Sequence, residues 1–228
     1  RFFTKLKILI PVYKNLAKDL TSYNLIQKGD YMIKASNRVK FLFEDETKRL
    51  YAAINNDTSR HKYRNKAIFY IAKYCALRAS EVSLLRMSDY DTENKLLFCS
   101  RLKNSKSNVL KIVESKTLSA FEDYYFSLSR SPEDYIFKSQ ENKAISRKML
   151  DKLMKHYCSI ANIDVSKSHF HVLKHTRAME LIEFVDMRDV QFWLGHKSIS
   201  NTLIYLDYTY KAREILFKKI SLIGENYE

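Results

Sequence analysis

The segment from His171 to Tyr205 gathers side chains whose types suit chemistry on a phosphodiester. His171 and Lys174 stand three positions apart, His196 follows further along the chain, and Tyr205 closes the segment. Residues three apart in a helix project to the same side, so His171 and Lys174 are expected to lie together. Imidazoles, an ammonium and a phenol bring hydrogen-bond donors and positive charge, which stabilise negative charge developing on a phosphate.

Two predicted helices must position these groups. The first begins near His171 and carries apolar residues at helical spacing: Val172, Leu173, Ala178, Met179, Leu181 and Ile182. The second runs from about Met187 to Trp193 and stops at Gly195, because glycine adopts the left-handed conformation that ends a helix. His196 and Lys197 are therefore predicted at the turn, and Tyr205 on a short segment beyond it.

Taken singly, each of these residues has an ordinary explanation, since histidines and lysines usually lie on the surface and tyrosines are usually half-buried. The occurrence of all these residues in one order is more informative than any one of them. His171-x-x-Lys174, Leu-Gly-His196 and Thr202-x-x-Tyr205 resemble the C-terminal half of the tyrosine recombinase signature. Lys174 departs from that pattern, because the family usually has arginine there, and lysine keeps the charge but loses the planar fork of donors.

Three explanations of Lys174 stay open: a natural variant that works with lysine, an engineered slow mutant, or a degenerate copy. We hypothesise an active natural variant, because the positive charge is preserved. Arg177 lies one turn further along the same helix and is predicted to support the site by substituting for the missing guanidinium. His175 is predicted to point away from Lys174 and to be structural, and His169 to lie in a loop or the core.

Upstream residues complete the resemblance. Leu77-Arg78-Ala-Ser-Glu81 is similar to the family's Leu-Arg-x-x-Glu motif, which implies a catalytic Arg78 oriented by Glu81 on a helix that Ser80 could cap. Residues 95–99 and 108–113 alternate like strands around a polar run and predict a β-hairpin. The family places a catalytic lysine on such a turn; Lys103 matches it best and Lys106 second, although most lysine-rich turns are simply exposed.

The resemblance implies a mechanism without metal, ATP or other cofactor. Tyr205 would attack a DNA phosphodiester and form a 3′-phosphotyrosyl bond, which stores the energy needed for rejoining. Arg78, His196 and Lys174 would stabilise the transition state, Lys103 would protonate the leaving 5′-oxygen, and His171 would assist proton transfer. Tyr208 and Tyr210 are rival nucleophiles that fit the motif less well.

Composition agrees with a double-stranded DNA partner. The 228 residues carry a formal charge of +14, although a lysine-biased genome would produce the same excess. Residues 1–43 hold nine Lys or Arg against two Asp or Glu, a net of +7 and half of the total. The predicted phosphate contacts are Lys28, Lys34, Arg38, Lys40, Lys106 and Lys197. The basic linker that holds the first four is equally well explained as a solvated, flexible connector.

The expected fold is mainly α with a small antiparallel β-hairpin or sheet (α+β), as in tyrosine recombinase catalytic domains. The expected parts are the end of a core-binding domain (1–27), a basic linker (28–42), the catalytic domain (43–210) and a C-terminal helix and tail (211–228). The opening at Arg1 without methionine suggests a fragment.

The tail would either dock on a neighbouring protomer of a tetramer bound to DNA or pack on its own domain. The three scattered cysteines suggest buried, reduced thiols in a cytoplasmic protein, and no apolar run is long enough to span a membrane. A type IB topoisomerase and a non-catalytic DNA-binding protein of the same fold remain alternatives.

Overall fold

The computed structural model describes residues 39–102 and 105–206. The chain divides into two units, Arg1–Val39 and Lys40–Glu228, and the fold described below is that of the second unit. The segments predicted at residues 1–27 and 211–223 lie outside the described residues, as do Lys28, Lys34, Arg38, Lys103, Tyr208 and Tyr210.

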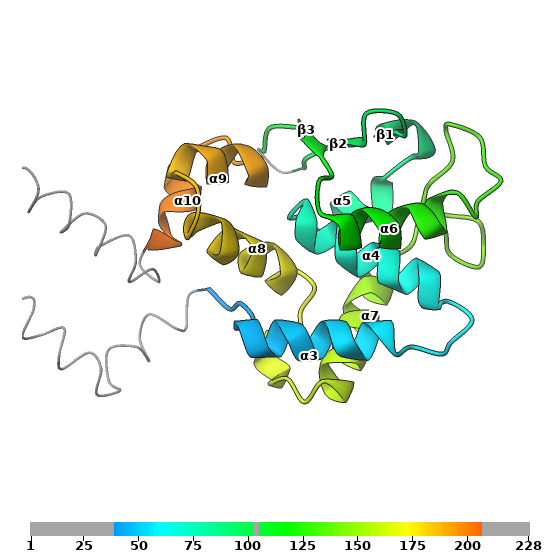
Figure 1. The fold of residues 1–228 in the computed structure, drawn as a ribbon, viewed down its shortest axis with the longest axis horizontal. Helices are drawn as coiled ribbons and strands as arrows, with labels where there is room; N and C mark the ends of the chain where they lie inside the picture. Colours follow the sequence, from blue (N-terminus) through cyan, green and yellow to red (C-terminus); the bar gives the residue numbers. More distant parts are fainter. Residues whose placement is uncertain (1–38, 103–104, 207–228) are drawn as a thin grey trace, which may run out of the picture. The chain divides into compact units, whose positions relative to one another are not determined.

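Helices make up most of the described chain (Figure 1). In chain order, the α-helices are α3 (Glu44–Asn55), α4 (Lys62–Tyr74), α5 (Ala79–Leu84), α6 (Ser115–Tyr125), α7 (Arg147–Ile160), α8 (Val172–Ile182), α9 (Met187–Leu194) and α10 (Ser200–Leu203). Two short 3-10 turns, η1 (Met87–Asp89) and η2 (Val165–Lys167), complete the helical elements. The predicted α+β class is confirmed.

The sheet has one strand more than the expected hairpin. β2 (Leu96–Cys99) pairs antiparallel with β3 (Asn108–Lys111), with Cys99 opposite Asn108. The short strand β1 (Tyr90–Asp91) adds to the other side of β2, so the order is β1-β2-β3. Two residues leave too little alternation for β1 to stand out in the sequence. The β2–β3 connection leaves the sheet at the end nearest the predicted site.

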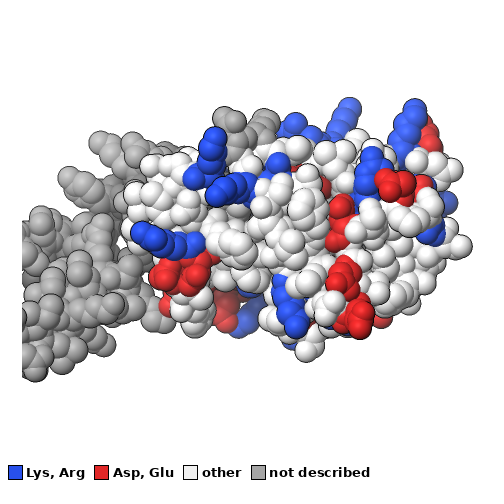
Figure 2. Space-filling model, turned by 90° about the horizontal axis from the view of Figure 1, so that it is seen from above, with Lys and Arg blue, Asp and Glu red and all other residues white. Residues whose placement is uncertain are grey.

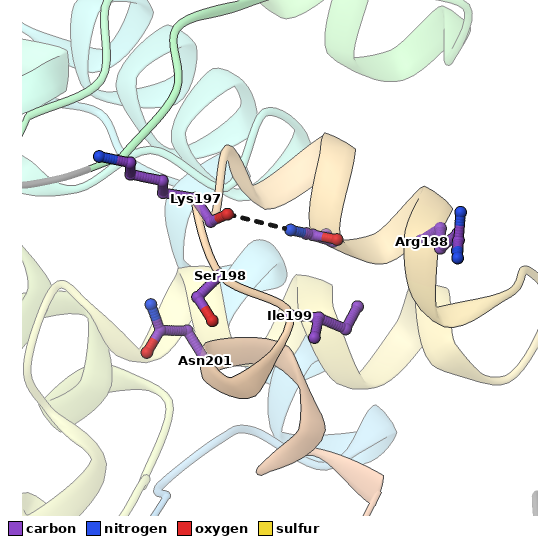
Figure 3. Close-up of a pocket in the computed structure, with 6 residues that line it drawn as sticks. Arg188, Lys197, Ser198, Ile199 and Asn201 are labelled. Atoms are coloured by element: carbon purple, nitrogen blue, oxygen red, sulfur yellow. Dashed lines mark hydrogen bonds between the residues drawn. The ribbon is translucent and has the colours of Figure 1, made fainter.

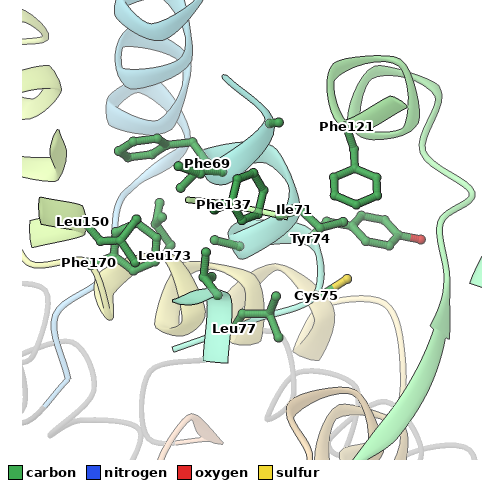
Figure 4. Close-up of a cluster of buried hydrophobic side chains, with 14 of the residues drawn as sticks. Phe69, Ile71, Tyr74, Cys75, Leu77, Phe121, Phe137, Leu150, Phe170 and Leu173 are labelled. Atoms are coloured by element: carbon green, nitrogen blue, oxygen red, sulfur yellow. The ribbon is translucent and has the colours of Figure 1, made fainter. Parts of the chain in front are cut away.

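Helix α4 lies at the centre of the hydrophobic core, packed against α3, α6 and α8. Four consecutive side chains of α4, residues 68–71, are almost completely buried, and a helix that is buried on all its faces needs apolar side chains on all of them. Figure 4 shows the buried side chains that meet around it, including Phe69, Phe137, Phe170 and Leu173. This core holds the helices that carry the candidate site. No helix within the described residues is long and apolar enough to cross a membrane.

The helix ends near the site follow local rules. Asp186 accepts hydrogen bonds from the backbone of Arg188 and Asp189 and so begins α9. Gly195 ends α9 with φ 66°, the left-handed conformation predicted for it. The expectation that Ser80 caps α5 was wrong, because Arg78 is the N-cap and its backbone N–H donates to the Glu81 carboxylate at 2.8 Å.

Candidate active site

Arg78 and Glu81 form the first part of the site, at the start of α5. Glu81 is buried and accepts from the Arg78 backbone and guanidinium, both at 2.8 Å. Burial raises the pKa of Glu81, but the Arg78 bonds and the charges of Lys174 and Arg101 outweigh it and leave the pKa lowered. The Arg78 side chain stays 31% exposed, and among the described residues only its Nη1 makes hydrogen bonds, to Glu81 and Ser105. The other guanidinium nitrogens therefore keep donors that no described residue uses.

Arg101, which sequence reasoning missed, ties three segments together beneath the site. Its buried guanidinium donates to Asn108 Oδ1 at 3.1 Å and to Glu81 at 3.3 Å. It also donates to the main-chain carbonyl oxygens of Cys75 at 2.8 Å, Ala76 at 3.1 Å and Trp193 at 2.9 Å. The sequence held no signal for this role, since an arginine beside a polar hairpin turn is ordinarily exposed.

The β2–β3 connection packs directly on the end of α9. The Lys106 backbone N–H donates to Gly195 O at 2.8 Å, and Ser105 pairs with His196 in an isolated antiparallel bridge. A Cβ built on Gly195 would lie 2.7 Å from Lys106 O and 2.8 Å from Arg101 Cγ. Glycine is therefore required here twice, for its left-handed backbone and for the close approach.

Lys174 and His196 meet where α8 faces the end of α9. Lys174 is 4% exposed and its Nζ donates to Leu194 O at 2.8 Å. Burial, followed by the charges of Arg101 and Arg78, lowers the pKa of Lys174 to about 7. Burial and the charges of Lys174 and Arg78 lower the pKa of His196 to about 3, so this imidazole is neutral. Its Nδ1 is 3.0 Å from the buried Thr202 hydroxyl, which leaves Nε2 for other partners.

Tyr205 lies just beyond α10 and its side chain is 1% exposed. Its hydroxyl is 2.8 Å from Nδ1 of His175, so this histidine, predicted to point away from Lys174 and to be structural, lies against the candidate nucleophile. The reason is geometric: α10 brings Tyr205 to the neighbouring side of α8, where position 175 faces inward. Burial raises the pKa of Tyr205 well above its ordinary value, partly offset by the charge of Arg78.

The imidazoles of α8 form a row with the loop that precedes it. His171 stands at the N-cap of α8, edge-on to His175 with ring centroids 5.5 Å apart. His169, predicted in a loop or the core, is exposed and stacks on His171 at 5.6 Å. Burial and the neighbouring His169 lower the pKa of His171.

Arg177, predicted to substitute for the guanidinium missing at Lys174, has other partners in this structure. Its guanidinium stacks over the rings of Tyr74 and Trp193, at 5.0 and 5.3 Å from their centroids, and pairs with Glu180 at 3.3 Å. Position 177 lies on the side of α8 that faces the aromatic core. Arg101 is the second guanidinium beside Lys174.

The predicted DNA contacts within the described residues differ in exposure. Lys106 and Lys197 are exposed, and Lys40 is half-buried. Lys197 lines an open groove of about 820 Å³ formed by α9, α10 and their connection, together with Arg188, Gln191, Ser198, Ile199 and Asn201 (Figure 3). Figure 3 shows Lys197 and Arg188 toward opposite ends of these residues. Figure 2 shows basic side chains spread over one face, interleaved with patches of Asp and Glu.

Comparison with known proteins agrees with this fold. Residues 40–212 match the model of the phage integrase family, and the chain belongs to that family. A tyrosine recombinase of Agathobacter rectalis is 31% identical over 186 residues, which cover 79% of this chain and 59% of that protein. The chain thus spans somewhat more than half the length of this relative.

Solved structures share the fold. The crystal structure of XerA recombinase is 26% identical, with a TM-score of 0.65, over 79% of this chain and 65% of that one. The catalytic domain of bacteriophage HP1 integrase is 20% identical, with a TM-score of 0.57, over 79% of this chain and 95% of that one. The second likeness shows the fold alone, and together they confirm the predicted resemblance to tyrosine recombinase catalytic domains.

Proposed function

We propose that this chain is the catalytic part of a site-specific DNA recombinase that cuts and rejoins DNA through a 3′-phosphotyrosyl intermediate. The observation that carries the proposal is the convergence of Arg78, Lys174, His196 and Tyr205 from four separate segments. The charges of Arg78 and Lys174 both depress the pKa of His196, and the charge of Arg78 also acts on Tyr205. Side chains that act on one another in this way suit the binding of a single anionic group of a substrate, such as a phosphate.

Each residue then has a role that its surroundings support. Arg78, anchored on Glu81 through one nitrogen, offers the rest of its fork to phosphate oxygens. His196 is neutral, and with Thr202 bonded to Nδ1 its Nε2–H can donate to a non-bridging oxygen. Tyr205 attacks phosphorus, and the leaving 5′-oxygen takes a proton from Lys103. His171 assists proton transfer, most usefully when the 5′-hydroxyl returns.

Lys174 can stabilise the transition state although its pKa is about 7 in the protein without DNA. A bound phosphodiester adds a negative charge beside the ammonium, and an opposite charge favours the protonated form. Lys174 then acts as a point charge, while Arg101 adds a fixed positive charge underneath. Lysine at this position therefore fits an active enzyme, in agreement with the natural-variant hypothesis.

The partner is double-stranded DNA bound along the face that carries Lys106 and Lys197, with Lys28, Lys34, Arg38 and Lys40 as further phosphate contacts. The +14 charge of the chain supports a polyanionic partner. We further propose that recombination takes place in a tetramer on DNA in the cytoplasm. Each chain would then contribute the end of a core-binding domain (1–27), a basic linker (28–42), the catalytic domain (43–210) and a C-terminal helix and tail (211–228).

A covalent-adduct assay tests this function. DNA fragments nicked to trap the cleaved state would be incubated with the protein, separated on a denaturing gel, and the attached peptide mapped. We expect an adduct on Tyr205 that Tyr205→Phe abolishes. Tyr157→Phe is the matched control, because Tyr157 is another buried tyrosine whose hydroxyl is hydrogen-bonded, to Asp57 and Asn65 in the core.

The outcomes separate the alternatives. An adduct on Tyr208 or Tyr210 would overturn the assignment of the nucleophile. Adduct formation without sequence preference would favour a type IB topoisomerase. Tight DNA binding without any adduct, in both the parent and Lys174→Arg, would leave a DNA-binding protein of this fold.

A further inference from the structure

The nucleophile proposed above needs a group that takes its proton. A phenol attacks phosphorus only as its O–H bond breaks, so an acceptor must lie within hydrogen-bond reach of the oxygen. Among the described residues, the hydrogen-bond partner of the Tyr205 hydroxyl is Nδ1 of His175, at 2.8 Å. The Glu81 carboxylate of the site already accepts from Arg78, Arg101 and the backbone of Leu102.

The surroundings of His175 favour an acceptor rather than a donor at Nδ1. The charged and titratable groups around the ring are Arg78 at the start of α5, His171 and Lys174 on α8, and Tyr205 beyond α10. The His196 imidazole after α9 is also close enough for the two rings to influence each other. Burial, followed by the charges of His171, Lys174 and Arg78, lowers the pKa of His175 to about 4, so the ring is neutral and keeps one nitrogen free to accept.

The row of imidazoles connects this acceptor with the surface. His171 lies edge-on to His175, and His169 stacks on His171; both of these rings are exposed, whereas Tyr205 is 1% exposed. The buried Tyr205–His175 pair is therefore bordered by two exposed imidazoles. A phosphate bound at Arg78 would add negative charge and offset the repulsion that Arg78 exerts on His175, which would make His175 a stronger base at the moment of attack.

We propose that His175 is a catalytic residue that orients the Tyr205 hydroxyl and accepts its proton through Nδ1 during DNA cleavage. This rests on the function proposed above. The Tyr205 O–H bond breaks and its proton moves to His175, while the oxygen lone pair forms the O–P bond. The P–O bond to the 5′-oxygen breaks, and that oxygen takes a proton from Lys103. In the rejoining step His175 returns the proton to Tyr205.

The test compares single-turnover cleavage of a nicked DNA substrate by the full chain and three variants. His175→Phe removes the acceptor, and we expect cleavage to fall on the order of 10²–10³-fold. His175→Asn keeps an oxygen acceptor near the Nδ1 position but cannot take the proton. His156→Phe is the matched control, because His156 is an exposed histidine on α7 away from the site, and it should cleave at the parental rate.

Two readouts separate proton transfer from a structural role. The rate of His175→Asn should rise about tenfold per pH unit between pH 6 and 9, because Tyr205 must then ionise to water, whereas the parental rate should be nearly flat. A substrate with sulfur in place of the leaving 5′-oxygen needs no acid, so it should rescue Lys103→Ala but leave His175→Phe slow.

Each result bears on the proposal. No Tyr205 adduct with the parent protein would overturn the recombinase function and this inference together. A parental adduct with His175→Phe equally fast would overturn the inference alone, and a faster variant would show instead that His175 restrains the tyrosine. Parallel pH profiles for His175→Asn and the parent would also overturn it. Equal DNA binding and thermal midpoints establish that the variants are folded.

Discussion

Arg101→Met is the most informative stability test, because Arg101 links the sheet connection, the end of α4 and the end of α9. The change removes a buried guanidinium while keeping an unbranched side chain. It leaves the carbonyls of Cys75, Ala76 and Trp193, previously bonded at 2.8–3.1 Å, without that donor. It also takes one cation from the buried Glu81.

The size of the effect follows from these partners. A hydrogen bond to a charged group contributes about 1.5–3 kcal/mol, and such contributions within one network are not additive. Removing one partner of a buried ion pair costs about 3–5 kcal/mol. We therefore expect Arg101→Met to lower the free energy of unfolding by about 3–5 kcal/mol, a large part of the ~5–15 kcal/mol typical of a domain.

Equilibrium unfolding in urea, followed by tryptophan fluorescence, measures this loss, since Trp193 lies in the affected segment. Arg147→Met is the control, because Arg147 is exposed on α7 and its loss should change stability by less than about 0.5 kcal/mol. A loss below about 1 kcal/mol for Arg101→Met would refute the reasoning. It would mean that the cost of burying the charge cancels its hydrogen bonds.

Three further predictions concern the same region. Gly195→Ala should cost more than about 2 kcal/mol in unfolding free energy, because the left-handed backbone costs about 1–2 kcal/mol and the new Cβ meets Lys106 O at 2.7 Å. Ser198→Ala, at an exposed position three residues later, removes only the hydrogen bonds between its hydroxyl and Ser200 and should cost about 1 kcal/mol or less. The contribution of His175 and His196 to stability should be full above about pH 6.5 and fall toward pH 4, because folding lowers their pKa values to about 4 and about 3, so that the unfolded chain binds more protons in this window. Urea midpoints at pH 7.5 and 4.5 measure this loss, and a double variant with asparagine at both histidines should lose less; equal midpoints for the parent would contradict it. Lys174→Arg should change the rate of covalent-adduct formation by less than about tenfold, whereas a rise of several hundredfold, the loss expected for one missing donor, would show that lysine is crippling.

The depressed pKa values in this site share one physical origin. Burial disfavours the charged forms of Lys174 and His196, and the fixed guanidinium groups of Arg78 and Arg101 add repulsion. In the free protein, burial and repulsion both favour loss of the protons on Lys174 and His196. A bound phosphate relieves the repulsion among the positive groups. The electrostatics of the free protein therefore favour binding of an anion before any chemistry takes place.

The sequence by itself determined the parts of this protein that depend on local rules. The apolar periodicity after His171 predicted α8, and the segment from Met187 to Trp193 predicted α9, each to within a residue or two, since apolar faces repeat along a helix. Gly195 predicted the end of α9, because the left-handed backbone is a local property of glycine. The ordered motifs around Arg78, Lys174, His196 and Tyr205 predicted the family, because motifs of that kind at that spacing in one chain resemble the family signature far more closely than any single residue does.

Only the tertiary structure decided which side chains meet. Arg101 and His175 are ordinary residues in the sequence, and their contacts come from segments that lie far apart along the chain. His175 was misjudged because helical spacing indicates the side of α8 on which it lies, but not that α10 returns to that side with Tyr205. Arg177 was misjudged for the same reason, since its partners Tyr74 and Trp193 come from α4 and α9. Local patterns specify elements and motifs, whereas the packing of those elements specifies the proton acceptors, buried charges and close contacts of a site.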